Sequence, residues 1–261
     1  MKKAEAKHVE ASLNKSNDHF SKYRKMFIGL FHLVFFVLIQ FFCFANPKPT
    51  GSAIYTSTCN PSEKPKQDSS FSIDDQDFGT FTDARDGKTY KTIKIGKQTW
   101  MAENLAYKTK DGIWAYDNKE SNVQKYGYLY TWEAAKQACP SGWHLPSDEE
   151  WRQLEMFLGM AKADTGLSGF RSDIGWKLKK TSGWHSKQKE NGTVGFEALP
   201  AGLYSFEDST FNDIEYNAYF WTDTSPKAEF VWERDLFDTF NEISRNRYKK
   251  TYGFSVRCIK D

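Results

Sequence analysis

Residues 139–151, CPSGWHLPSDEEW, gather side chains that could carry out chemistry within a short stretch. A cysteine beside an imidazole can act as a nucleophile with its base, and Cys139 and His144 are separated only by a turn containing Pro-Ser-Gly. The acidic residues Asp148–Glu150 could belong to an acid–base or metal site. The same stretch could also be a structural corner between two helices, so the flanking elements must be considered first.

A helix is predicted on each side of this stretch. The first covers residues 128–139 and ends at Pro140, and its apolar stripe consists of Tyr128, Trp132, Ala135 and Cys139. The second begins at Ser147, which forms a capping box with Glu150, and it ends near Gly159. The remaining acidic residues of its first turn interact favourably with the positive, N-terminal end of the helix dipole. The acidic run therefore has a structural explanation.

The first 82 residues differ from the rest of the chain. Residues 1–25 form an n-region ending in the basic run KYRK, and residues 26–45 contain no fully charged side chain at neutral pH. A helix of this length just spans a hydrocarbon core of about 30 Å. The basic flank places residues 1–25 in the cytosol. Because Cys43-Phe44-Ala45 also fits a signal-peptidase site, residues 26–45 are expected to be a signal peptide or a membrane anchor.

Residues 46–82 are rich in Pro, Ser, Thr and Lys and show no sustained periodicity, so they are expected to form a disordered linker. Cys59 lies within it and is assigned no role. All nine tryptophans lie at or after Trp100, which places the folded domain in residues 83–261. With either fate of residues 26–45, this domain is expected to be extracytoplasmic.

The composition excludes several function classes. A net charge of +2 gives no overall field for nucleic-acid binding. The sequence has no P-loop, dinucleotide fingerprint, zinc-spaced Cys/His cluster or HExxH motif, so no cofactor, metal site or catalytic residue is predicted. The aromatic content of 16% indicates a core built from large rings.

The folded domain is predicted to be α+β, with two helices, short antiparallel strands and long loops. Residues 83–101 read as an opening β-hairpin with a turn at Gly96-Lys97. Later strands are predicted at 219–224, 229–236 and 252–259, and the basic stretch 245–250 is expected to be a solvated loop.

Two cysteines, Cys139 and Cys258, lie in this domain. Cys258 shares one face of the last predicted strand with Phe254 and Val256 and is expected to point inward. An oxidising compartment permits disulfides, so a bond between the two is the favoured interpretation. A free Cys139 acting with His144 is the alternative.

Exposed rings offer a candidate site, because flat rings stack on sugar faces. His185 lies in a glycine-flanked loop beside one of them and is expected to be solvated. The candidate ligand-binding residues are Trp184, Tyr204, Tyr216, Tyr219, Trp221 and Asp223. Core packing is the alternative explanation for most of these rings.

Four segments together resemble the Fibrobacter succinogenes major paralogous domain, a bacterial surface and secreted family. They are DGKTYKTIKIGKQTWMAENL, YGYLYTWEAAKQACPSGWHLPSDEEW, YFWT and YGFSVRCIKD, and the resemblance spans residues 83–261. It implies an exported, non-enzymatic module and brings no set of catalytic residues.

A more distant likeness is to the superfold shared by C-type lectins and the formylglycine-generating enzyme. It implies a C-type-lectin-like domain, in which the cysteine of the first helix pairs with that of the last strand, in agreement with the favoured disulfide. The sugar-binding Glu-Pro-Asn or Gln-Pro-Asp tripeptide is absent, Trp221-Thr222-Asp223 only loosely resembles the Trp-Asn-Asp calcium motif, and Cys258 has no second cysteine near it. Neither calcium-dependent sugar binding nor the oxidase chemistry carries over.

The sequence therefore predicts an exported, surface-associated and non-catalytic binding module, whose partner is a polysaccharide or an envelope protein. The membrane is a further partner through residues 26–45 if that segment is not cleaved. Two alternatives stay open, namely an oxidase or hydrolase of the formylglycine-generating type and a purely structural envelope protein.

Overall fold

The structure, a computed structural model, describes residues 77–186, 192 and 194–261. The predicted n-region 1–25, the apolar segment 26–45 and most of the linker 46–82 lie outside these ranges. The helices, with η for a 3-10 helix, are η2 (Tyr116–Asn118), η3 (Glu120–Asn122), α2 (Val123–Tyr126), α3 (Trp132–Ala138), α4 (Asp148–Phe157) and η4 (Gly175–Leu178). The strands are β1 (Asp77–Thr82), β2 (Thr89–Ile95), β3 (Gln98–Met101), β4 (Ile113–Trp114), β5 (Leu129–Tyr130), β6 (Trp143–His144), β7 (Gly169–Arg171), β8 (Ala201–Ser205), β9 (Thr210–Ile214), β10 (Asn217–Trp221), β11 (Phe230–Phe237), β12 (Ile243–Lys249) and β13 (Ile259–Lys260).

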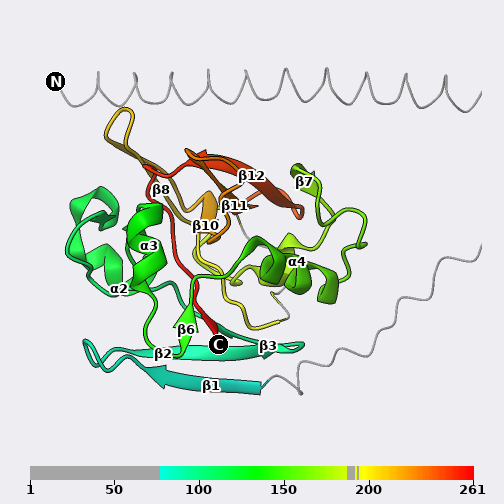
Figure 1. Cartoon of the computed structure of the whole chain (residues 1–261), viewed down its shortest axis with the longest axis horizontal. Helices are drawn as coiled ribbons and strands as arrows, with labels where there is room; N and C mark the ends of the chain where they lie inside the picture. The colour runs from blue at the N-terminus through cyan, green and yellow to red at the C-terminus, as the bar shows by residue number, and fades with distance from the viewer. Residues whose placement is uncertain (1–76, 187–191, 193) are drawn as a thin grey trace, which may run out of the picture. The chain divides into compact units, whose positions relative to one another are not determined.

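The described part of the chain is α+β, with many strands and a few short helices. One sheet has the strand order β1-β2-β3-β13-β6, and a second has the order β7-β12-β11-β10-β8-β9. Figure 1 shows β1, β2 and β3 together at the bottom of the view and β10, β11 and β12 toward the top. None of the helices in the described ranges is long and apolar enough to cross a membrane.

The predicted opening hairpin is confirmed. Strands β2 and β3 pair antiparallel, and Gly96 in their turn adopts a φ of +61°. Their inward side chains Ile93 and Trp100 are fully buried. The expected linker boundary at residue 82 is wrong, because β1 pairs with β2 from Asp77 opposite Lys94 to Thr82 opposite Thr89. β1 is mostly exposed, so backbone hydrogen bonds rather than apolar burial hold it to the sheet.

The second sheet confirms two of the predicted late strands. The segments 219–224 and 229–236 correspond to β10 and β11, which pair antiparallel. The basic stretch 245–250 is not a solvated loop, because most of it belongs to β12 and Arg245 is buried. Arg245 reaches Asp148 with two hydrogen bonds of 2.8 and 2.7 Å, so its charge is compensated inside the fold.

The C-terminal segment 252–259 is a connection between the sheets rather than one continuous strand. Ser255 bridges to Phe220 of β10, and Ile259 then pairs with Trp100 of β3 and His144 of β6. In Figure 1 this red segment runs from the upper sheet down to the lower one. Both of its faces are therefore covered by protein.

The two predicted helices are confirmed with one changed boundary. α3 begins at Trp132 rather than at residue 128, because Leu129–Tyr130 forms β5 and Thr131 caps the helix by accepting from the Ala134 N–H. The capping box of α4 is present, with Ser147 and Glu150 bonded reciprocally. Gly159 follows the helix with a φ of +107°, as expected for a terminating glycine.

The predicted disulfide is also confirmed. Cys139, the C-cap of α3, is bonded to Cys258 with a Cα–Cα distance of 5.9 Å. The bond joins the end of α3 to the segment that leads into β13. The thiol of Cys139 is therefore not free to act as a nucleophile with His144.

Candidate functional site

Arg257 is a charged side chain in the interior, with only 1% of its surface exposed. Its Nε donates to Oδ1 of Asn104 at 2.7 Å, and its Nη2 donates to the carbonyl of Glu197 at 3.0 Å. Its Nη1 donates to the carbonyls of Met101, at 3.2 Å, and of Phe196. All four acceptors are uncharged, so no carboxylate of the described residues is hydrogen-bonded to this buried cation.

Asn104 fixes the guanidinium in place. Its Nδ2 donates to the carbonyl of Tyr126 at 2.8 Å and to Oγ of Ser255 at 3.2 Å, which leaves Oδ1 to face Arg257. The backbone around it is pinned as well, because the Leu105 N–H donates to the Val256 carbonyl at 2.9 Å. The turn after β3, the end of α2 and the C-terminal segment thereby meet at one point.

Gly127 allows α2 to approach this point closely. It adopts a φ of +75°, and a Cβ at this position would lie 2.6 Å from the carbonyl oxygen of Leu105. Only glycine combines this backbone conformation with such a contact. The packing of the pocket wall therefore requires glycine at position 127, directly after α2.

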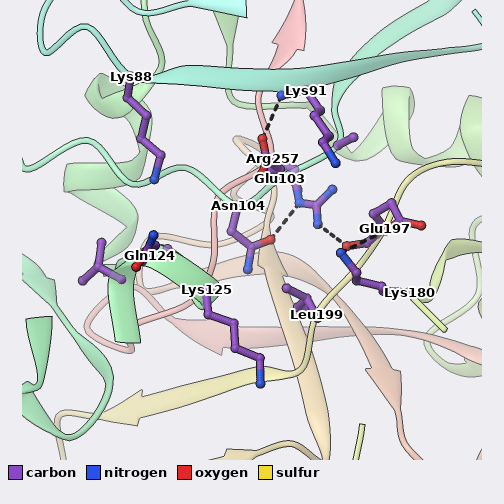
Figure 2. A pocket seen from close by; sticks show the side chains of 13 residues that line it. Lys88, Lys91, Glu103, Asn104, Gln124, Lys125, Lys180, Glu197, Leu199 and Arg257 are labelled. Atoms are coloured by element: carbon purple, nitrogen blue, oxygen red, sulfur yellow. Dashed lines mark hydrogen bonds and ion pairs between the residues drawn. The ribbon is translucent and has the colours of Figure 1, made fainter. Parts of the chain in front are cut away.

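A pocket of about 410 Å³ opens beside Arg257 (Figure 2). Its cationic residues are Lys88, Lys91, Lys125, Lys180 and Arg257. Its acidic residues are Glu103 and Glu197, so the described lining side chains carry a net charge of +3. The uncharged residues of the lining are Ala102, Asn104, Val123, Gln124, Gly127 and Leu199.

The acidic residues neutralise this charge only in part. The Glu197 carboxylate pairs with Lys180 at 3.2 Å, and Glu103 accepts from the backbone N–H of Lys91 at 2.8 Å. Burial lowers the pKa of Arg257, and the charges of Glu103 and Glu197 raise it by less. A guanidinium still keeps its proton at neutral pH, so the wall of the pocket is cationic.

Three rim lysines complete the positive surface. Within the part of the chain that the structure describes, the ammonium groups of Lys88, Lys91 and Lys125 form no ion pair with a carboxylate. Lys125 lies over the ring of Tyr126 at 4.5 Å, and Lys88 lies 5.4 Å from the ring centroid of Tyr90. These groups are available to an anionic ligand.

The sequence-predicted aromatic site is not formed as an exposed platform. Trp184, Tyr204, Tyr219 and Trp221 are buried, with exposures of 8%, 9%, 5% and 0%. Tyr219 and Trp221 lie on one face of β10, where both pack against Phe254 at centroid distances of 5.1 and 4.3 Å. Core packing explains these two rings, because β10 lies inside the sheet and is covered by the C-terminal segment. It explains the other two as well, since Tyr204 stacks on Trp114 at 4.0 Å and Trp184 belongs to a hydrophobic core cluster.

The two remaining candidates of that group are exposed but lie in different settings. Tyr216 is 46% exposed and stacks on His185 at 4.5 Å. Asp223 follows β10, where its N–H donates to the Pro146 carbonyl and its Oδ1 accepts from Thr224. Neither residue lines the pocket beside Arg257.

His144, without a firm role in the sequence, is held between two carboxylates. Its Nδ1 lies 2.6 Å from Oδ1 of Asp261, and its Nε2 lies 2.9 Å from Oε1 of Glu150. The acidic run also does more than cap α4, since Asp148 is buried and bonded to Arg245 and Arg234. Among the described residues, no group of three or more His, Cys, Asp or Glu side chains could hold a metal ion.

Sequence reasoning missed the pocket because it assigned no role to Arg257, the central residue. The alternation that turns Cys258 inward with Phe254 and Val256 leaves Arg257 on the other face of the predicted strand. An available signal was that Arg257 stands between Val256 and Cys258 in a run with few other polar residues. Such a run is also typical of a segment buried on both faces.

Residues 93–260 match the sequence model of the Fibrobacter succinogenes major domain. The match begins within β2 and includes Asn104, Cys139, Cys258 and Arg257. Comparison with curated proteins and with solved structures gave no match. Because the matched residues make up more than half of the chain, the chain belongs to the Fibrobacter succinogenes major domain family.

Proposed function

We propose that this chain is an exported, surface-associated binding module without catalytic activity, and that the pocket beside Arg257 holds its ligand. The ligand is a glycan or a protein of the cell envelope, with the glycan favoured by the size of the pocket. The observation that carries the proposal is a buried guanidinium with four uncharged acceptors in the wall of a pocket of net charge +3.

The residues of the pocket favour binding over reaction. A hydrolase or thiol oxidase needs a nucleophile with a base beside it. Among the described residues, the pocket lining contains lysine, arginine, glutamate and amide side chains and no cysteine, histidine, serine or threonine. Cys139 and Cys258 are joined to each other, and both nitrogens of His144 are occupied by carboxylates.

Two further observations support export. The apolar segment 26–45 suits a signal peptide or membrane anchor, and the Cys139–Cys258 bond suits an oxidising compartment outside the cytosol. We infer as well that the fold is C-type-lectin-like. The bond from the end of α3 to the segment before β13 has the positions expected in that superfold.

The test uses the full chain, solubilised in a neutral detergent. The purified chain is applied to arrays of plant and bacterial glycans, to insoluble polysaccharides and to envelope protein fractions. We expect retention on a polysaccharide class, reversal by the matching free oligosaccharide, and recovery of that oligosaccharide uncleaved. No retention on any of these materials, or a cleaved product, would contradict a non-catalytic binding module.

A further inference from the structure

We infer that the pocket beside Arg257 selects an acidic glycan, whose anionic oxygen group lies among Arg257 and the rim lysines. This inference rests on the proposed binding function and specifies the chemical class of ligand for the same pocket. The anionic group is a carboxylate of a uronic acid or a sulfate ester on a sugar. Neutral sugars of the same ring type are expected to bind much more weakly.

The first argument is the distribution of charge. The full chain has a net charge of +2, whereas the lining of this one pocket carries +3. The positive excess is therefore local rather than spread over the surface. Like charges held close together repel one another, and an anion bound among them relieves that repulsion. A neutral sugar would leave it in place.

The second argument is the hydrogen-bonding capacity of Arg257. A guanidinium has five N–H groups. Arg257 uses four of them, namely one on Nε, two on Nη1 and one on Nη2, for the four uncharged acceptors described above. One N–H of Nη2 has no acceptor among the described residues. Figure 2 shows the guanidinium between Asn104 and Glu197 in the lining of the pocket, and we assign an oxygen of the ligand as the acceptor of this N–H.

The third argument is the arrangement of the rim lysines. Lys91 lies on β2, Lys88 precedes that strand, and Lys125 lies on α2, so two separate elements present ammonium groups to one cavity. Lys91 and Lys125 are exposed and pair with no carboxylate within the described ranges. Long cationic side chains of this kind supply point charges to a carboxylate or a sulfate.

The shape of the pocket favours a sugar over an acidic peptide. A cavity of about 410 Å³ lies in the range of small-molecule sites. An extended peptide generally adds to a free sheet edge, but β2 is paired on both sides, with β1 and β3. Val123 and Leu199 supply apolar surface for the carbon face of a ring, and Gln124 supplies an amide for hydroxyl groups.

The test measures the affinity of the full chain, in neutral detergent, for four probes. They are an oligogalacturonate, its methyl ester, a sulfated galactan and a neutral galactan. The methyl ester keeps the ring and removes the charge. We expect the oligogalacturonate or the sulfated galactan to bind at least roughly tenfold more tightly than its uncharged counterpart, and the stronger of the two identifies the anionic group.

Two matched double variants locate the site. Lys91→Gln with Lys125→Gln removes two charges from the rim, and Lys94→Gln with Lys97→Gln removes two exposed charges outside the pocket. The rim variant is expected to lower affinity for the acidic probe roughly tenfold, and the control variant less than about twofold. All four lysines are exposed, so both variants should keep the melting temperature of the parent chain.

The possible failures are distinguishable. If charged and uncharged probes bind equally and the rim variant behaves like the control, the acidic-glycan inference is overturned while the binding function stands. If polyglutamate displaces the glycan at equal concentration of charge, the ligand is an acidic protein segment and the sugar is excluded. If no glycan and no envelope protein binds, the inference and the proposed function fail together.

Discussion

Nδ1 of His144 lies 2.6 Å from Oδ1 of Asp261, the last residue of the chain, and Nε2 of the same ring lies 2.9 Å from Oε1 of Glu150. His144 is on β6, which pairs with β13, and Glu150 is in the first turn of α4. One imidazole therefore fastens the C-terminus to a helix and a strand more than a hundred residues earlier. Such a link favours the protonated imidazole, because both of its partners are carboxylates.

The link to His144 should make stability depend on pH. Burial alone would lower the pKa of His144, but the hydrogen bonds to Asp261 and Glu150 outweigh it and raise the pKa above 6.5. A base whose pKa rises on folding contributes stability below its unfolded pKa, and this contribution disappears as pH rises through the folded value. We expect the unfolding free energy to fall above pH 6.5, and the slope to be shallower in His144→Gln.

Denaturant titrations of the full chain across this pH range provide the measurement. His185→Gln is the matched control, because His185 is exposed and stacks on Tyr216. That control should keep the parent slope. An unchanged slope in His144→Gln would contradict a stabilising role for the imidazolium.

The disulfide should contribute strongly to stability. Cys139 and Cys258 are 119 residues apart in the sequence, and closing such a loop restricts the unfolded chain. The chain-entropy treatment gives about 4 to 5 kcal/mol for a loop of this length. We expect Cys139→Ala with Cys258→Ala to lose a large part of this amount in denaturant titrations. Mass spectrometry of the unreduced, digested protein should recover the peptides of both cysteines joined, and their recovery as separate thiols would contradict the bond.

Local sequence signals predicted the features that depend on neighbouring residues. The α4 capping box needs only Ser147 and Glu150, and the β2–β3 turn needs only a glycine that tolerates positive φ. The disulfide followed from the compartment and from the inward positions assigned to the two cysteines. In each case the physical cause lies within a few residues or in a single pairing.

Features that depend on distant partners were missed. Nothing in DFGTFT shows apolar alternation, because β1 is held by its backbone ladder with β2. The stretch around Arg245 resembles a loop until Asp148, 97 residues away, is seen to neutralise it in the interior. Arg257 was assigned no role because the second layer that covers its segment comes from other parts of the chain. Burial on both faces cannot be read from one strand alone.

The buried charges around Glu155 should be sensitive to the loss of one partner. Glu155 is fully buried and accepts from Arg171 at 2.7 and 2.8 Å and from Nε of Arg234 at 2.5 Å. Glu155→Gln leaves buried cations with insufficient compensation, which typically costs about 3 to 5 kcal/mol. We expect a loss of this order in the free energy of unfolding, measured by denaturant titration at neutral pH.

Glu149→Gln is the control on the same helix. Glu149 is exposed and pairs with Arg152 at 2.9 Å, so its removal should change stability by less than about 1 kcal/mol. Equal losses of unfolding free energy in the two variants would show that the buried network contributes no more to stability than an exposed ion pair.

Removing the charge of Asp235 should stabilise the protein, unlike removing that of Glu155, because the negative charge of Asp235 opposes folding at neutral pH. Burial raises the pKa of Asp235 from 3.8 to about 6, and the pKa of Glu233 on the same strand is raised well above 4.5 for the same reason. An acid whose pKa rises on folding costs nothing below its unfolded pKa and opposes folding increasingly as pH rises through the folded value. Asp235→Asn keeps the shape and removes the charge. We therefore expect this variant to equal the parent near pH 4 and to be more stable by roughly 1 to 3 kcal/mol above the raised pKa.

Paired denaturant titrations of parent and Asp235→Asn at acidic and neutral pH provide the measurement. Asp173→Asn is the control. Because Asp173 is exposed, the difference in unfolding free energy between this variant and the parent should be the same at acidic and at neutral pH. A loss of stability in Asp235→Asn of equal size at both pH values would contradict the expectation. The carboxylate would then act through hydrogen bonds such as the 3.4 Å contact with Asn246, and the cost of burying its charge would be outweighed. A gain that appears only at neutral pH would instead show that the buried negative charge of Asp235 opposes folding.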